Sequence, residues 1–287
     1  MRPTLETPRR HASPLAFFCL SLGIAAFSPA PKANGWSAVD TPNDGPARSI
    51  GLPSSGCISG AHSLPLEGTG YEVMHIERNR YYGHPRLVQT IEDLGHLTAR
   101  RKLGLLHVGD LGQPRGGPMS FGHRSHQTGL DVDIWFDLNP RLSAGANATR
   151  GNLDAPSMLL PSKKGLNYAA WTANQMAVLE LAANLPGVDR IFVNAHIKKE
   201  LCEQAEGERE WLRKIRPWHY HDDHFHLRMS CPDDSPSCDA QDPIPPGEGC
   251  DASLDWWFQH QPAATPPSPP PPKPRLPLEC QDVLSMP

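Results

Sequence analysis

The sequence predicts an α+β fold, and two observations favour this class. Segments with the alternation of β-strands and segments with helical periodicity follow one another in mixed order along the chain. The regular strand and helix alternation of a doubly wound parallel sheet is absent. With 287 residues, 38% of them hydrophobic and 20% charged, the chain can bury one sizeable core. We therefore expect one main domain of the α+β class.

Two strands and one helix are predicted in the first half of this domain. Residues 71–77 (YEVMHIE) are strand-like, and residues 86–101 repeat leucine and isoleucine at the spacing of one helix face. A second strand is expected at 103–108. Residues 109–125 are dense in glycine and proline, and an irregular stretch of this length is typically functional or disordered.

The second half is predicted to contain three strands and three helices. The strands cover 129–138, 188–194 and 224–229. The helices cover 171–185, 197–206 and 208–215. Pro217 is expected to end the last helix, because proline removes a backbone donor and its ring clashes with the preceding turn.

The N-terminus resembles an export signal. Arg9 and Arg10 precede an apolar run from Leu15 to Phe27, and small residues follow near Ala30. The run is too short to span a bilayer comfortably, and no later run approaches about 20 apolar residues. We expect residues 1–30 to be removed on export to the periplasm, which leaves a mature chain without a transmembrane segment.

The mature chain divides into three regions. Residues 31–56 are rich in glycine, proline and serine and predict a loosely structured lead-in, and residues 57–260 form the main domain. Residues 261–287 form a tail that contains PPSPPPP, which predicts extended polyproline. We expect Cys280 to tie this tail back onto the domain.

The charge balance argues against nucleic acid as a partner. The formal net charge is −4, and no run of lysine and arginine offers a basic face to a polyanion. The oligomeric state is not predicted by any feature of the sequence.

Six cysteines remain after removal of the signal, an even number that predicts three disulfides in an exported protein. Six cysteines allow 15 pairings, and their spacing alone favours only a local loop between Cys231 and Cys238. A zinc site made of cysteines is disfavoured, because the chain has no Cys-x-x-Cys pair.

Six of the 14 histidines lie in two short segments, 120–133 (SFGHRSHQTGLDVD) and 218–226 (WHYHDDHFH). On strands, Asp131 and Asp133 would share one face, and so would His224 and His226. A loop histidine such as His126 can meet that face. Zinc prefers imidazole nitrogen and carboxylate oxygen, and a catalytic zinc keeps one position for water. The two segments therefore predict one divided zinc site.

Serine chemistry and the common helical zinc proteases are both disfavoured. The chain has no Ser-x-x-Lys, no Gly-x-Ser-x-Gly and no His-Glu-x-x-His. Without an acyl-enzyme, a β-lactam has no serine to acylate.

The segments 109–136 (GDLGQPRGGPMSFGHRSHQTGLDVDIWF) and 211–232 (WLRKIRPWHYHDDHFHLRMSCP) resemble the penicillin-insensitive murein endopeptidases. These belong to the zinc peptidase group that includes lysostaphin, D-Ala-D-Ala dipeptidases and hedgehog domains. The resemblance extends from about residue 45 to 280. It implies a small antiparallel sheet flanked by helices and long loops, and peptidoglycan stem peptides as the substrate.

The resemblance also implies roles for individual residues. The group pattern His-x6-Asp and His-x-His implies that His126, Asp133 and His226 hold zinc, with His224 as a base or transition-state stabiliser. His123 matches a further histidine associated with the metal. Trp218 matches a tryptophan of the cleft, and His221 matches a histidine important for activity. The matched cysteines imply the disulfides Cys57–Cys280, Cys202–Cys250 and Cys231–Cys238.

Three neighbouring acids are expected to play smaller parts. Asp131 either bonds a ligand imidazole or is solvated. Asp222 and Asp223 are expected to be exposed charges. The chain departs from its relatives in the stretch LLPSKKGLN, residues 159–167, which lacks the Asp-x-x-His pair that can hold a second metal. We therefore predict one zinc ion rather than two.

The implied reaction is hydrolysis of the D-alanyl to diaminopimelyl cross-link, with the diaminopimelyl to diaminopimelyl link as a further target. Two alternatives stay open at this point. One is a D,D-carboxypeptidase or dipeptidase of the same group, and the other is a cell-wall binding module that keeps the metal without catalysis.

Overall fold

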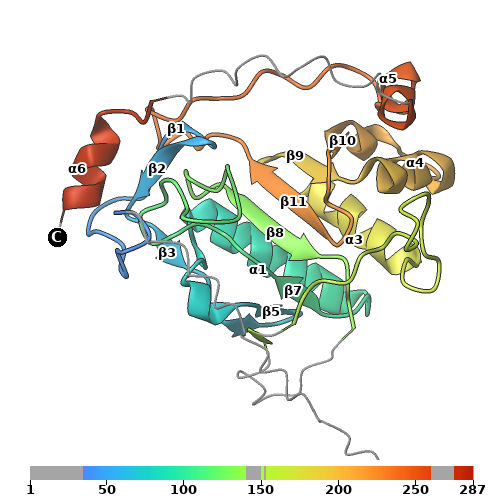
Figure 1. Cartoon of the computed structure of the whole chain (residues 1–287), viewed down its shortest axis with the longest axis horizontal. Coiled ribbons are helices and arrows are strands. Elements are labelled where there is room, and N and C mark those ends of the chain that lie inside the picture. The colour runs from blue at the N-terminus through green and yellow to red at the C-terminus, as the bar shows by residue number, and fades with distance from the viewer. Residues whose placement is uncertain (1–34, 140–149, 152, 260–274, 287) are drawn as a thin grey trace, which may run out of the picture. The chain divides into compact units, whose positions relative to one another are not determined.

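The computed structural model describes residues 35–139, 150–151, 153–259 and 275–286. The expected signal over 1–30, and the proline run at 266–272, lie outside these residues. The centre of the described chain is a mixed sheet with the strand order β10, β9, β11, β8, β7, β5, β4 (Figure 1). Its strands are β4 (Glu67–Gly68), β5 (Tyr71–Val73), β7 (Leu106–Val108), β8 (Asp131–Trp135), β9 (Val188–Val193), β10 (Ile215–Pro217) and β11 (His224–Met229).

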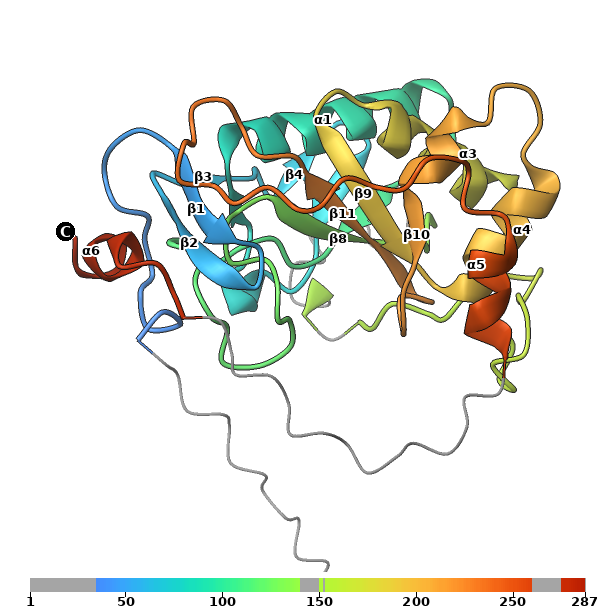
Figure 2. The same cartoon turned by 90° about the horizontal axis from the view of Figure 1, so that it is seen from above.

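Two long helices cover one face of this sheet, as both views show (Figure 1, Figure 2). The first is α1 (Pro85–Arg100), where Pro85 takes the first turn and His84 Nδ1 accepts a hydrogen bond from the Arg86 amide. The second is α3 (Ala173–Asn184), which begins with a reciprocal capping box between Thr172 and Gln175. These caps supply partners for amides that a helix leaves unpaired at its start.

The helices and the sheet enclose the main core. Val132 and Ile134 of β8 and Phe225 and Leu227 of β11 are at most 1% exposed. They pack in one cluster with leucines of α1 and α3 and with Ile91 of α1. Each such side chain stabilises the fold by about 1.5–3 kcal/mol when fully buried. A slip of one residue in either strand would exchange these side chains for charged ones. Core packing therefore fixes which side chains reach the opposite face.

A smaller hairpin and the C-terminus form a second layer of contacts. β1 (Arg48–Leu52) pairs antiparallel with β2 (Ser55–Ser59), and β3 (His62–Ser63) pairs with β6 (Tyr82–Gly83). The disulfide between Cys57 and Cys280 joins β2 to α6 (Glu279–Ser285), as the resemblance implied. Arg115 donates from Nη1 to the carbonyls of Val283 and Leu284, so it also holds the end of α6.

The remaining elements are short, apart from α4 (Ala195–Gln204). They are α5 (Ala252–Asp255) and the 3₁₀ turns η1 (Ile76–Arg78), η2 (Glu210–Lys214) and η3 (Trp256–Phe258). The other two predicted disulfides are also present, Cys202–Cys250 and Cys231–Cys238.

The α+β class is confirmed. The strand predicted at 71–77 ends at Val73, and Ile76–Arg78 form η1 instead. Three larger differences concern the sheet, the segment 208–217 and the lead-in. The sheet is mixed, because β9 with β10 and β5 with β7 pair parallel. Residues 208–215, predicted as a helix, form η2 and the start of β10, and Pro217 lies in that strand. A proline is tolerated there because β10 is at the edge of the sheet. The third difference is that β1 and the first residues of β2 fall within the predicted lead-in 31–56.

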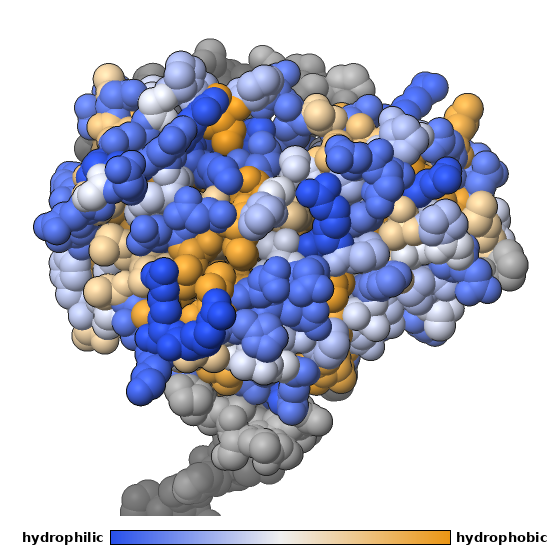
Figure 3. Space-filling view, turned by 180° about the vertical axis from the view of Figure 1, so that it is seen from behind, coloured by the Kyte–Doolittle hydropathy of each residue, from blue (hydrophilic) through white to orange (hydrophobic). Residues whose placement is uncertain are grey.

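On the side opposite the view of Figure 1, the surface is mostly hydrophilic, with a hydrophobic patch left of its centre (Figure 3). Within the described ranges, none of the helices has the length and apolar character that a membrane span requires.

Candidate metal centre

The polar face of the sheet presents four side chains from two neighbouring strands. Asp131 and Asp133 lie on β8, and His224 and His226 lie on β11. The two strands are antiparallel neighbours, and His226 stands directly opposite Asp133. Alternation along both strands therefore gathers these side chains on one face, as the sequence predicted.

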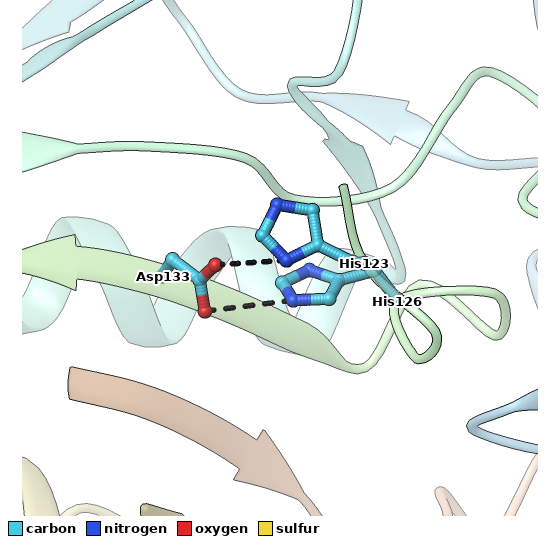
Figure 4. Close-up of side chains that lie close together, drawn as sticks. All are labelled: His123, His126 and Asp133. Carbon is cyan, nitrogen blue, oxygen red and sulfur yellow. Dashed lines mark ion pairs between the residues drawn. The ribbon is translucent and has the colours of Figure 1, made fainter. Parts of the chain in front are cut away.

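The long loop before β8 adds His123 and His126 to this face (Figure 4). His126 is fully buried and has a left-handed backbone with φ of 70°. A histidine in this conformation is strained, and strain of this kind persists only where the surroundings impose it. Here the His126 amide donates to Asp131 Oδ2 at 2.9 Å. Gln127 ties the loop further, since its Nε2 donates to the carbonyl oxygens of Ser54 and Arg124.

Asp133 is the centre of the cluster. Its Oδ1 lies 3.5 Å from His126 Nε2 and 3.0 Å from His226 Nδ1, and its Oδ2 lies 3.2 Å from His123 Nδ1. The His224 Nε2 atom is 3.6 Å from the same Oδ2. Figure 4 shows the imidazoles of His123 and His126 side by side against the two carboxylate oxygens. Four imidazoles from a loop and a strand thus converge on one carboxylate.

In each of these four imidazoles, the nitrogen that faces away from Asp133 contacts an oxygen acceptor. His126 Nδ1 is 3.1 Å from the Leu111 carbonyl oxygen, and His123 Nε2 is 2.9 Å from Asp110 Oδ2. The same scheme holds for the two β11 histidines: His226 Nε2 is 3.1 Å from Asp131 Oδ1, and His224 Nδ1 is 2.5 Å from Asp223 Oδ1.

Carbonyl and ionised carboxylate oxygens accept but do not donate, so each outer nitrogen donates. In a neutral imidazole, the inner nitrogen is then an unprotonated lone pair. All four lone pairs point toward Asp133, as they do where hydrogen-bond acceptors behind the rings orient the histidines of a metal site.

Two of these four acceptors, Asp131 and Asp110, are themselves held by arginines. Arg228 donates from Nε to Asp131 Oδ1 at 2.5 Å and from Nη2 to Oδ2 at 3.3 Å, and all of Asp131 is buried. Arg80 donates from Nη1 to Asp110 Oδ2 at 2.9 Å. Bidentate contact with a guanidinium fixes the plane of a carboxylate, which in turn fixes the ring that donates to it.

The local charges keep both site carboxylates ionised. Burial would raise the pKa of Asp133, but the imidazoles of His224, His126 and His123, in their protonated forms, outweigh it and hold that pKa well below its usual range. Burial likewise opposes ionisation of Asp131, and the neighbouring Arg228 and His226 hold its pKa far below normal. For Asp110, burial is outweighed by the hydrogen bond from His123 and by the arginines, so the pKa falls to about 2.

The imidazoles differ in the direction of their shifts. Burial lowers the pKa of His126, whereas in His226 the adjacent carboxylates of Asp131 and Asp133 overcome burial and raise it. For His224, burial is outweighed by Asp133 and Asp223, which raise the pKa to about 9. Burial lowers the pKa of His221 to about 4.

The donor set fits a divalent metal ion. His126 Nε2 and Asp133 Oδ1 are buried atoms that make no hydrogen bond within the described structure, although buried polar atoms normally have a partner. A cation among these atoms would satisfy both. The ligand atoms of His123, His126 and Asp133 all lie within 4.8 Å of one another. Nitrogen and oxygen donors in this number are typical of zinc sites.

The loop between β10 and β11 places His221 beside the cluster. Its ring centroid is 4.9 Å from that of His224 and 6.0 Å from that of His226. Tyr220 and His221 have φ of 61° and 47°, so two consecutive residues adopt the left-handed conformation. Asn194 holds them there: its backbone N–H donates to the His221 carbonyl at 2.8 Å and its side-chain Nδ2 donates to the Tyr220 carbonyl at 3.0 Å.

The other residues singled out from the sequence lie around this cluster. Trp218 lies at the edge of the cluster and is 53% exposed, and its ring centroid is 5.5 Å from that of Phe192. His219 is exposed, and Asp131 bonds a site imidazole rather than being solvated. Asp222 and Asp223, expected as exposed charges, are both half-buried and paired: Asp223 with His224, and Asp222 with Lys163 Nζ at 2.5 Å. Lys163 belongs to the stretch 159–167 that lacks a second metal pair.

Sequence reasoning missed Asp110, Arg228 and Asn194. Asp110 follows the end of β7 by two residues, and an acid after a strand in a glycine-rich loop was a usable signal. Arg228 lies on the same strand face as His224 and His226, because the three residues are two positions apart on β11, and this spacing was also a signal. Asn194 had a weaker signal, as an asparagine that caps α4.

Comparisons with known proteins find similar chains. A family model described as penicillin-insensitive murein endopeptidase matches residues 49–285. A protein of that name from Haemophilus influenzae is 42% identical over 257 residues, which cover 88% of each chain. Another from Klebsiella pneumoniae is 41% identical over 264 residues, 92% of this chain and 95% of that protein. A third, from Salmonella paratyphi C, is 41% identical over 94% of this chain and 95% of its own.

Proposed function

The chain belongs to the family of penicillin-insensitive murein endopeptidases, and on this premise we propose that it hydrolyses D-alanyl to meso-diaminopimelyl cross-links of peptidoglycan with one catalytic zinc ion. That it is a peptidase acting on murein follows from the family match. Murein lies outside the cytoplasm, and we place the protein in the periplasm, exported by the signal expected at residues 1–30. The diaminopimelyl to diaminopimelyl link is a further candidate substrate.

The observation that supports the metal is the orientation of the imidazoles around Asp133. Their outer nitrogens all contact oxygen acceptors, which leaves inner lone pairs facing a buried carboxylate. We assign His126 Nε2, His226 Nδ1 and an Asp133 oxygen as zinc ligands, with His123 Nδ1 as the fourth protein donor. When bound, the ion supplies Lewis acidity, which lowers the pKa of water and polarises the carbonyl of the bond to be cut.

We assign His224 as the group that moves the proton. Its Nδ1 contacts Asp223 at 2.5 Å, so the proton on that nitrogen is held. A cation bound to Asp133 would offset the carboxylate charge that raises the pKa of His224, and Nε2 would then face the cluster as an acceptor. Nε2 can take a proton from the attacking water and pass it to the leaving amine. The charge that His224 gains in this step lies between the carboxylates of Asp223 and Asp133. That placement stabilises the imidazolium.

His221 is assigned to contact the substrate or the attacking water. Its Nδ1 is 2.7 Å from the His219 carbonyl oxygen, so Nδ1 donates and Nε2 is left as an acceptor. The strained backbone at residues 220 and 221, held by Asn194, keeps this ring beside His224. Trp218 at the edge of the cluster offers an exposed aromatic surface to a stem peptide.

The test is digestion of cross-linked and uncross-linked muropeptides by the purified mature chain. We expect cross-linked dimers to become monomers, no release of terminal D-alanine from monomers, loss of activity with a chelator and recovery with zinc. A β-lactam should leave the activity unchanged, because the mechanism has no acylated serine. Release of D-alanine from monomers would instead indicate a carboxypeptidase.

His224→Ala separates catalysis from metal binding. The variant should keep about one zinc per chain and lose activity by roughly 10²–10⁴-fold. A wild-type chain that binds zinc but cleaves no dimer would be a binding module, and this would overturn the proposed reaction.

A further inference from the structure

A pocket of about 430 Å³ adjoins the histidine cluster without including it. Volumes of 300–1,000 Å³ are typical of small-ligand sites. Its walls contain the aromatic side chains of Trp218, Tyr220, Trp257 and Phe258. We call this the aromatic pocket. Its connection to the cluster is the segment 220–222, in which Tyr220 and Asp222 line the pocket while His221 stands beside His224.

The aromatic pocket has no unpaired charge among its lysine and acid side chains. Lys163 and Asp222 are its single lysine and its single carboxylate, and their Nζ and Oδ2 atoms are 2.5 Å apart. Lys163 also donates to Ser157 Oγ at 2.9 Å. The lining also contains two histidines, His196 and His219, and burial lowers the pKa of His196, which disfavours its charged form. The pocket therefore complements a neutral ligand rather than an anionic one.

The outer wall of the pocket is held rigidly in place. Trp257 and Phe258 lie in η3, directly after α5, and both views place α5 beside α4 (Figure 1, Figure 2). The disulfide Cys202–Cys250 joins these two regions. The fully buried Lys198 of α4 donates from Nζ to the Glu248 carbonyl at 2.6 Å.

These anchors set the spacing of the aromatic rings. The ring centroid of Trp257 is 6.4 Å from that of Trp218, and that of Phe258 is 5.0 Å from that of His196. A wall fixed before the ligand arrives loses little conformational entropy on binding.

We propose that the aromatic pocket binds an amino-sugar ring of the glycan strand while the attached stem peptide lies over the histidine cluster. This inference rests on the proposed function, since a peptidoglycan substrate links the bond that is cut to a sugar through a short stem peptide. Sugar rings present a face of C–H groups, which packs on the electron-rich face of an aromatic ring. Their hydroxyl and N-acetyl groups are neutral. A stem peptide, by contrast, has free carboxylates that would need unpaired cations.

The experiment compares two forms of the same cross-linked dimer, one with its disaccharides and one from which an amidase has removed them. Wild-type protein should cleave the sugar-bearing dimer with the higher kcat/KM. Trp257→Ala should lower kcat/KM about tenfold on the sugar-bearing dimer, as expected for loss of one stacked ring. On the sugar-free dimer it should change kcat/KM by less than about twofold.

Trp256→Ala is the matched control, because Trp256 is the adjacent tryptophan, is 48% exposed and does not line the pocket. Trp257→Leu keeps bulk without the aromatic face and replaces Trp257→Ala if that variant does not fold, as judged by zinc content and circular dichroism. Equal losses on both dimers would show that the pocket holds the peptide and would overturn the proposal, as would no loss on either. Failure of the wild type to cleave both dimers would contradict the proposed function instead.

Discussion

His226 Nδ1 lies 3.0 Å from Oδ1 of Asp133, the residue directly opposite it on the neighbouring strand. Two residues that are 93 positions apart in the chain (226 − 133) thus form the closest imidazole to carboxylate contact around Asp133. The contact depends on strand register, and the register depends on the apolar side chains of the opposite face.

Asp133→Asn should abolish metal binding. The amide removes the negative charge that four imidazoles face, and amides are poor zinc ligands. We expect zinc content after dialysis to fall from about one ion per chain to below about one tenth. Mass spectrometry of the metal measures this, with Asp242→Asn, an exposed acid, as the control. A variant that retains a full zinc ion would contradict the assigned ligand set.

Asp131→Asn should weaken both the fold and the metal site. The change leaves the guanidinium of Arg228 buried without its counter-charge, which costs about 3–5 kcal/mol. It also alters the acceptor of His226 Nε2, and changes to such acceptors lower metal affinity about 10–100-fold. Urea unfolding in excess chelator measures the first effect, and zinc competition with a chromogenic chelator measures the second. Unchanged values in both assays would show that Asp131 supports neither.

Because Lys198 is buried, we expect the free energy of unfolding to rise with pH. Burial lowers the pKa of Lys198 from 10.5, its ordinary value, to about 7 in the folded protein. Between these values the unfolded chain binds more protons than the folded chain, so the free energy of unfolding increases with pH across this window. Below about pH 7 both the folded and the unfolded chain hold the Lys198 proton, so this residue no longer makes the free energy of unfolding depend on pH. The slope for one proton is at most about 1.4 kcal/mol per pH unit.

Lys198→Met should remove this slope from urea unfolding curves recorded between pH 7 and 10. The control is Lys199→Met, because Lys199 is the next residue on α4 and its side chain is 56% exposed. Parallel slopes in wild type and in Lys198→Met would show that the Lys198 amine keeps its ordinary pKa.

The disulfide Cys57–Cys280 should contribute more stability than Cys231–Cys238. It closes a separation of 223 residues, whereas the second closes seven. Chain entropy makes the difference between them about 3 kcal/mol. Thermal unfolding of the two double serine variants measures it, and limited proteolysis should show early loss of α6 in the Cys57 and Cys280 variant. If loss of Cys231–Cys238 destabilised the protein as much as loss of Cys57–Cys280, restriction of the unfolded chain would not be the main source of disulfide stabilisation.

The local periodicity of the sequence was sufficient to predict the elements that position the site. The predicted strand 224–229 has the same bounds as β11, and the predicted helix 86–101 is offset from α1 by one residue. Alternation within each strand then predicted which faces His224, His226, Asp131 and Asp133 share. These predictions succeeded because a strand places alternate side chains on one face whatever the rest of the chain does.

The β1 and β2 hairpin and the strand at Pro217 were not predictable in the same way. Gly51 and Gly56 lie in the hairpin where a Cβ would meet backbone at 2.6 Å and 2.2 Å, so close packing selects glycine there. In the sequence these residues resemble an irregular stretch. Pro217 is compatible with a strand only because β10 is at the sheet edge, which no local pattern reveals.

By itself, the sequence determined the residue types of the centre, the two segments that contain them and the face of each strand. The tertiary structure alone decided that Asp110, Asp131, Asp223 and the Leu111 carbonyl accept from the four imidazoles, and that Arg80 and Arg228 hold two of those acids. It also decided that Trp257 stands opposite Trp218. The physical reason is range: alternation is a property of neighbouring residues, whereas hydrogen bonds between distant segments depend on how the whole core packs.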